Sequence, residues 1–370
     1  MAEAIQTRRK RYINTWLLVR IAVGVLVGAY LLYRLWIILF VEQPYGPDTW
    51  LRFIISGTIL GSVYAVIALG YTLVYGILFM INFAHGDVMM LGCFAGYFTL
   101  EVLDGSGFLN RDIPSTIISL AVTFAIGMTV GTLVAIALER IAYRPLRMAP
   151  RLVPLISAIG ASLFLQNAAQ LMFGSARHTY TNPDVIERNT GWTIMVGGEG
   201  VLITYTGVLT IVLSIILMVG LALLVKRSKM GMAMRAVAED KQTAALMGIN
   251  VDRVIGSTFA ISGALAGAAG VLWGLHMGIV YHFVGFVPGL KAFTAAVMGG
   301  IGNIPGAVVG SLILGLAENY GVGIPLGWLA WIFVAGLLAG GYIQMFRAPM
   351  QRVGHIRDEI ATPEYLSLYT

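Results

Sequence analysis

The segment INFAHGDVMM, at residues 81–90, places three polar groups close together in an otherwise apolar run: the Asn82 amide, the His85 imidazole and the Asp87 carboxylate. Such groups could line a polar path or act as a gate. They could also join two helices where lipid offers no hydrogen bonds, with Gly86 in the turn and Asp87 capping the second helix. One imidazole and one carboxylate are too few ligands for a metal. We therefore expect no metal and no cofactor.

A second polar interruption is GGIGNIPG, at residues 299–306. Asn303 and Pro305 break an apolar run there, as the broken helices of transporters do. Both residues are candidates for a gate or a path lining, with packing and turn geometry as the alternative. The surrounding region, 288–321, fits either two short spans or one re-entrant segment.

The composition points to a protein that lipid solvates. Of the 370 residues, 58% are hydrophobic and only 11% are charged, against about 25% charged in soluble domains. The mean hydropathy is +0.82. We expect an all-α, polytopic transmembrane helix bundle. The net charge of +6 fits the basic cytoplasmic loops of membrane proteins, so nucleic acid is not an expected partner.

Apolar runs long enough to cross the hydrocarbon, about 20 residues each, predict eight clear spans. They cover 15–40, 52–79, 85–103, 115–139, 153–173, 202–225, 254–280 and 327–346. Together they make one transmembrane domain, 15–346, with a basic tail at 1–14 and a second tail at 347–370. The function of the second tail, and that of the polar outer loop 174–200, stays open.

The basic residues set the orientation. They gather before the first span, in 140–151, in 226–253 and after the last span, which makes these segments and both termini cytoplasmic. Parity then favours two crossings in 288–321 and about ten spans in all. With an inside N-terminus, INFAHGD lies near the cytoplasmic boundary or at a break between the second and third spans. Spans two to five and seven to ten would enter in opposite directions, which suits an inverted repeat.

The longest cytoplasmic loop, 226–253, contains the segment MAMRAVAEDKQTAALMG. This segment predicts an amphipathic helix ending at Gly248, after which Asn250 and Asp252 can cap the next helix. A helix, a glycine and a short helix form a suitable element for docking into a groove of another protein. The alternative is a solvated linker that lies on the membrane.

The loop resembles the coupling loop of ATP-binding cassette (ABC) importer permeases, and the whole chain is similar to the branched-chain amino acid permease family. The resemblance covers roughly residues 50–346 and is carried by three blocks: ALGYTLVYGILFMINFAHGDVMMLG at 68–92, RAVAEDKQTAALMGINVDRVIGSTFAISGALAGAAGVL at 235–272, and FTAAVMGGIGNIPGAVVGSLILGLAE at 293–318. The chain differs from the family pattern in its long N-terminal segment, its 174–200 loop and its C-terminal tail.

The resemblance implies a pore-forming permease subunit in the bacterial inner membrane, importing leucine, isoleucine and valine, with no enzyme activity of its own. The implied partners are two cytoplasmic ATP-binding subunits, a second related permease and a soluble or lipid-anchored substrate-binding protein. The sequence contains no GxxxxGK[ST] phosphate loop, which agrees with ATP binding by separate subunits. The implied coupling residues are Arg235, Glu239, Asp240, Ala244 and Gly248.

Three alternatives remain at this point. The same kind of permease could carry urea, short amides or other amino acids. An ion-coupled transporter would need an ionisable group near mid-span, and Glu101, Glu139 and Glu318 lie near predicted span ends. We therefore expect an apolar lining with no charged site at mid-membrane. An intramembrane enzyme would need a nucleophile, a base and an orienting group, and the sequence offers no such grouping.

Overall fold

A computed structural model describes residues 28–30, 33, 36, 45–147, 149–150 and 152–323. Residues Tyr45–Gly323 form one compact unit. The predicted tails 1–14 and 347–370 and the last span 327–346 lie outside the described residues, as does most of the first span, 15–40.

Within the described residues, six helices are long and apolar enough to cross a membrane. They are α2 (Pro47–Leu78), α3 (His85–Gly105), α4 (Ile113–Leu138), α5 (Leu152–Phe173), α6 (Tyr205–Arg227) and α9 (Val251–Met277). A π-helical turn, Glu139–Tyr143, and a 3-10 turn, Arg144–Leu146, extend α4. The predicted helical membrane fold is thus confirmed, with six of the predicted spans seen as helices.

Two predicted span boundaries are wrong for local reasons. The span predicted at 202–225 begins too early, because residues 199–204 form a strand and the Thr204 side chain caps α6 by accepting the Gly207 N–H. The span predicted at 254–280 ends too late, because Gly278 takes a left-handed conformation, φ 77°, that closes α9, a position that favours glycine.

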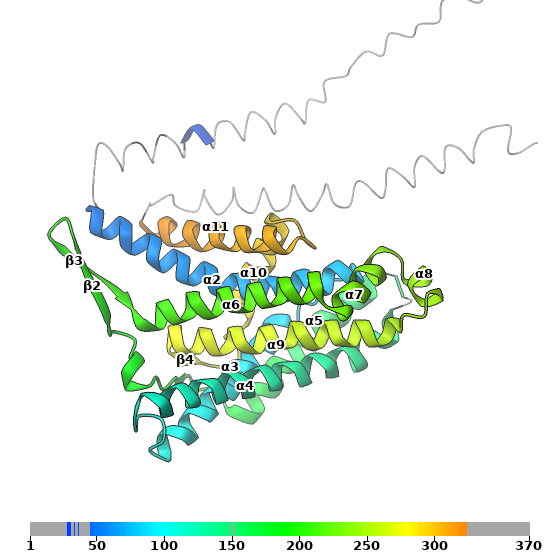
Figure 1. Ribbon diagram of the computed structural model, residues 1–370, viewed down its shortest axis with the longest axis horizontal. Coiled ribbons are helices and arrows are strands. Elements are labelled where there is room, and N and C mark those ends of the chain that lie inside the picture. The colour runs from blue at the N-terminus through cyan, green and yellow to red at the C-terminus, as the bar shows by residue number, and fades with distance from the viewer. Residues whose placement is uncertain are drawn as a thin grey trace, which may run out of the picture. The chain divides into compact units, whose positions relative to one another are not determined.

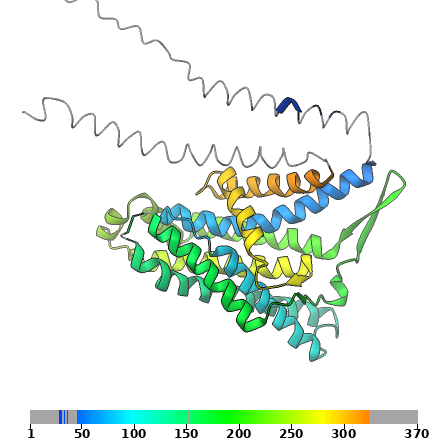
Figure 2. The same cartoon turned by 180° about the vertical axis from the view of Figure 1, so that it is seen from behind.

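The broken region 288–321 is two helices, α10 (Phe286–Met298) and α11 (Ile304–Gly323). With 13 residues, α10 reaches only about 20 Å, less than the roughly 30 Å of the hydrocarbon. α11 runs beside α2 in both views (Figures 1 and 2), where Leu312 and Leu316 pack on Gly61 and Gly57.

The two ends of the bundle carry different elements (Figure 1). At one end lie α7 (Lys229–Glu239) and α8 (Lys241–Leu246). At the other, β2 (Gly191–Val196) and β3 (Glu199–Thr204) form an antiparallel hairpin, whose turn uses Gly197 and Gly198 at positive φ. β1 (His178–Thr179) pairs with β4 (Ile279–Val280). The loop 174–200 is therefore strand-forming, which the all-α prediction missed.

The middle of the bundle belongs to α2 and α9. In the most apolar 18-residue stretch of each helix, 72% is buried for α2 and α9, against 17% for α6 and 22% for α4. The outward faces of α4, α5 and α6 expose large apolar side chains such as Leu133, Leu171 and Ile216. In water such faces would be costly, so these helices are suited to contact lipid or other membrane subunits.

The contact between α4 and α9 is built around glycines on both helices. Gly127 and Gly131 of α4 face Gly263 and Gly267 of α9 so closely that an added Cβ on Gly267 would collide with the Gly127 carbonyl. Small residues allow such close approach of helix backbones in lipid.

We expect Gly267→Ala to destabilise the protein by about 1–3 kcal/mol, because its methyl group must push two backbones apart. Gly256→Ala lies on the same helix with nothing within 4 Å of an added Cβ, so it should gain up to about 1 kcal/mol from helix propensity. Thermal unfolding midpoints in one detergent compare the two. Equal shifts for both variants would contradict the close packing.

Candidate functional site

The candidate site begins at the break between α2 and α3. α2 ends because Phe79 adopts a left-handed conformation (φ 56°, ψ 30°) and donates its N–H to the Tyr75 carbonyl at 2.8 Å. Non-glycine residues visit this region rarely, at a cost of about 1–2 kcal/mol. Residues 79–82 are irregular, and a short turn then leads into α3 at His85.

α3 begins inside the bundle. The His85 ring packs against Gly70, where an added Cβ would collide with it, and its Nδ1 lies 3.4 Å from the Ser262 hydroxyl. Gly70 precedes the end of α2 by eight residues, or about 12 Å along the helix. Of the two predicted positions for INFAHGD, the break between spans is confirmed. His85 and Asp87 are buried within the bundle, and their position relative to the cytoplasmic boundary stays a prediction.

The three polar residues of this segment are buried, and Asp87 does not have the capping role predicted for it. Asn82 accepts a hydrogen bond from the Tyr143 hydroxyl at 2.6 Å. The Asp87 carboxylate accepts from the Ser162 hydroxyl and, at 2.9 Å, from the Gln166 amide, both on α5. Asp87 does not cap α3, whose N-cap is Ala84 without a side-chain bond. The three residues therefore tie α3 and its lead-in to neighbouring helices.

Asp87 is a carboxylate inside the bundle, which the predicted apolar lining did not include. Its partner Ser162 is at the middle of α5, and Asp87 itself is only 1% exposed. The sequence could not show this, because the depth of Asp87 depends on the chain turning back before α3 starts.

A second helix also begins inside the bundle. After α9 closes at Gly278, the chain reaches α10 at Phe286. An added Cβ on Gly285 would collide with the Gly86 carbonyl, and one on Gly86 with the Gly285 carbonyl. The first turns of α3 and α10 therefore touch through glycines.

The predicted second break, 299–306, lies away from the contact between α3 and α10. It joins α10 to α11, with Gly302 next to Gly76 near the end of α2. Asn303 and Pro305 are exposed there. The structure therefore does not bring them together with Asn82, His85 and Asp87.

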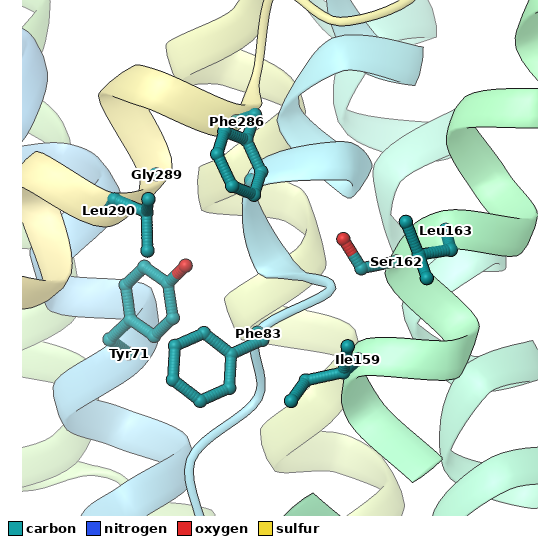
Figure 3. Close-up of a pocket in the computed structure, with 9 residues that line it drawn as sticks. Tyr71, Phe83, Ile159, Ser162, Leu163, Phe286, Gly289 and Leu290 are labelled. Carbon is teal, nitrogen blue, oxygen red and sulfur yellow. The ribbon is translucent and has the colours of Figure 1, made fainter. Parts of the chain in front are cut away.

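A cavity of about 250 Å³ lies between the first turns of α3 and α10, the C-terminal third of α2 and the middle of α5. Figure 3 shows the hydroxyls of Tyr71 and Ser162 pointing into it from opposite walls. The other lining residues are apolar or glycine: Phe83, Gly86, Ile159, Leu163, Phe286, Gly289 and Leu290. Sequence reasoning missed Tyr71 and Ser162, since single hydroxyls in apolar runs carry no spacing signal.

A further polar cluster ties α10 and α11 to α2. Lys291 pairs with Glu318, which also accepts from the Tyr64 hydroxyl at 3.0 Å. The sequence interpretation placed Glu318 near a span end and overlooked Lys291.

The loop between α6 and α9 is a shaped element. The Asp240 carboxylate caps α8 by accepting the N–H groups of Gln242 and Thr243 and the Thr243 hydroxyl. These bonds hold the pKa of Asp240 below its usual 3.8. The cap is therefore complete above that pH and is lost as the pH falls through the lowered value. Gly248 follows at φ 83°.

The predicted coupling residues divide into buried and exposed ones. Arg235 donates to the Val225 carbonyl at the end of α6, and Ala244 is buried. Glu239 is exposed at the end of α7, and beyond it Leu246 and Met247 are 87% and 80% exposed. The loop thus presents an acidic residue and an apolar tip on a fixed scaffold.

The loop is also linked to α4. Asn250 caps α9, as predicted, by accepting the Arg253 N–H at 3.0 Å. Asp252, the other predicted cap, pairs with Arg144 at 2.8 Å and with Arg147 instead. Arg147 also pairs with the buried Glu139.

Comparisons with known proteins agree with this architecture. Residues 53–341 match the family described as "Branched-chain amino acid transport system / permease component". The chain is 43% identical to the high-affinity branched-chain amino acid transport system permease protein BraD of Pseudomonas aeruginosa, over 74% of this chain and 87% of BraD. It is 43% identical to the corresponding protein LivH of Escherichia coli K12, over 71% and 83%.

A more distant relative is the probable branched-chain amino acid transport permease protein LivH of Methanocaldococcus jannaschii, 30% identical over 79% of this chain and 86% of that protein. No solved structure matches.

We expect Gln166→Leu to cost about 1.5–3 kcal/mol of stability, because a buried carboxylate loses a hydrogen-bond donor. Adding Asp87→Asn should recover part of that loss, since a neutral amide tolerates the missing donor better. Thermal unfolding of wild type, both single variants and the double variant completes the cycle. Strictly additive effects would show that the two side chains do not interact.

Proposed function

Because the chain belongs to the branched-chain amino acid transport system permease family, we propose that it is the pore-forming subunit of an ATP-driven importer of leucine, isoleucine and valine. The family match over residues 53–341 carries this proposal. The chain is a multi-pass protein of the bacterial inner membrane, and the family transports its solute rather than converting it, so an intramembrane enzyme is excluded. Relatives named as permease proteins of such transport systems support the solute.

The partners follow from the same proposal. Two cytoplasmic ATP-binding subunits supply energy, a second related permease completes the pore, and a soluble or lipid-anchored binding protein delivers the solute. The absence of a GxxxxGK[ST] loop from the sequence supports an external source of ATP hydrolysis.

The loop 226–253 is the proposed coupling element. Its exposed Glu239, Leu246 and Met247 suit contact with a groove of an ATP-binding subunit. Asp240 and Gly248 hold the shape of the loop, while Arg235 and Ala244 fix it to the bundle.

The proposed topology keeps about ten spans in one domain, 15–346, with cytoplasmic tails at 1–14 and 347–370. An inverted repeat is supported by two corresponding pairs: α2 with α3, and α9 with α10. In each pair a long helix is followed by a helix that begins inside the bundle, and the two second helices meet at Gly86 and Gly285. An experimental structure whose halves fail to superpose would remove the repeat.

We assign the gate to the segment carrying Asn82, His85 and Asp87. Its irregular lead-in and strained Phe79 suit a segment that changes shape, because strained backbone often accompanies a switch. Asn303 and Pro305 would line the cytoplasmic mouth rather than the gate, as their exposed turn beside Gly76 suggests.

The test is reconstitution of the complete assembly in liposomes with its binding protein. We expect ATP-dependent uptake of leucine, isoleucine and valine, little uptake of urea, and no uptake driven by a proton or sodium gradient alone. Uptake of urea in preference to leucine would change the solute. Gradient-driven uptake without ATP would reject the ABC assignment.

The coupling loop gives a sharper prediction. Glu239→Ala and Leu246→Asp should each lower ATP-driven uptake roughly tenfold or more, because truncating a central docking residue costs about 2 kcal/mol or more. Leu246→Met keeps an apolar tip and should transport normally. Membrane insertion, measured by the yield of protein and by gel filtration, should be unchanged in all three variants. Normal uptake by the first two variants would remove this role from the loop.

A further inference from the structure

We propose that the cavity lined by Tyr71 and Ser162 is a binding site for a zwitterionic α-amino acid within this chain. The hypothesis rests on the proposed function and adds to it. The permease would then select its solute by chemistry, in place of the featureless apolar lining expected from the sequence.

One wall of the cavity offers a hydrogen-bond donor. The Tyr71 side chain is 5% exposed and points into the cavity (Figure 3). The Gly86 backbone N–H bonds to its hydroxyl oxygen, and no acceptor for the hydroxyl proton is found in the part of the chain that the structure describes. That proton is therefore available to a ligand carboxylate.

The backbone around Tyr71 also favours a ligand carboxylate. The first turns of α3 and α10 meet at the cavity through Gly86 and Gly289. Helix N-termini carry partial positive charge and favour anions. In transporters, helices that begin in mid-membrane point their N-termini at the anionic groups of solutes.

The opposite wall offers an acceptor. The Ser162 hydroxyl donates to Asp87 and its oxygen accepts from the Gln166 amide at 3.1 Å. One lone pair of that oxygen is left for a ligand. Behind it, Asp87 carries a buried charge with no cation among the ion pairs of the described residues. An unpaired buried anion is costly, and an ammonium group bound at Ser162 would offset part of that cost.

The remaining walls suit an aliphatic side chain. Phe83, Phe286, Ile159, Leu163 and Leu290 surround the two hydroxyls. About 250 Å³ is below the range of sites for drug-sized ligands and suits one small solute. Ile159 and Leu163 are 46% and 54% exposed, so the cavity opens along α5, where a solute path could reach it.

The experiment measures equilibrium binding of radiolabelled leucine to the purified complete transporter in nanodiscs, without binding protein. Two competitors report on the two ends of leucine: 4-methylpentanoate is leucine without its ammonium group, and isoamylamine is leucine without its carboxylate. The variants are Tyr71→Phe and Ser162→Ala. Tyr97→Phe and Ser119→Ala are matched controls, because these residues lie outside the cavity lining.

We expect Tyr71→Phe and Ser162→Ala each to weaken leucine binding roughly tenfold or more, since each removes a hydrogen bond to a charged group. Tyr71→Phe should weaken binding of 4-methylpentanoate but not of isoamylamine, and Ser162→Ala should do the reverse. The controls should bind leucine as wild type does. This pattern distinguishes direct contact from general misfolding, which would weaken both competitors alike.

Three results would overturn the site: wild type that binds no leucine at millimolar concentration, variants that bind as wild type does, or equal losses for both competitors. None of these affects the proposed function, because ATP-driven leucine uptake by wild type with its binding protein is measured separately. Failure of that uptake would reject the function instead.

Discussion

The structure depends on one constraint: two helices, α3 and α10, begin within the apolar bundle, so their first N–H groups need partners that lipid does not supply. α3 and α10 meet this constraint together, because Gly86 and Gly285 let their first turns touch backbone to backbone. A side chain at either position would force the turns apart. The positive ends of two helices are thereby concentrated at one place, and an acid, Asp87, lies in the first turn of α3.

Several polar side chains buried in the bundle connect elements that the sequence separates widely. Asn82 with Tyr143 and Asp87 with Ser162 and Gln166 hold the break after α2, while Glu318 with Tyr64 and Lys291 ties α10 and α11 to α2. Where lipid surrounds a protein, apolar contact alone does not distinguish one helix arrangement from another. The few hydrogen bonds and ion pairs can distinguish between arrangements. The close glycine faces of α4 and α9 allow these bonds to form.

Sequence reasoning found the elements better than it found the site. Apolar length located six helices, and the charge of the loops separated the two ends, because both signals are local. The sequence also marked INFAHGD as unusual, since an amide, an imidazole and a carboxylate stand out there. It did not show that Asp87 is buried among other helices, because nothing local shows that Phe79 turns the chain back. It missed Tyr71, Ser162 and Lys291 because their partners come from other helices. The all-α prediction omits the β2–β3 hairpin for a simpler reason: it gives no weight to the Gly197–Gly198 pair as a turn signal.

α9 gives a physical route from the coupling loop to the cavity. It begins at Asn250, directly after the loop, its Ser262 touches His85 at the start of α3, and its end leads into α10. Near its start, Asp252 holds Arg144 and Arg147 just before α5, the helix that carries Ser162. A rigid shift of α9 therefore acts on the cavity from three sides: α3, α10 and α5. In the proposed cycle, force applied at Leu246 would separate or close the Tyr71 and Ser162 walls without unfolding any helix. The energy of ATP hydrolysis could then change the affinity of the cavity for the solute, which an apolar pore with no binding site would not permit.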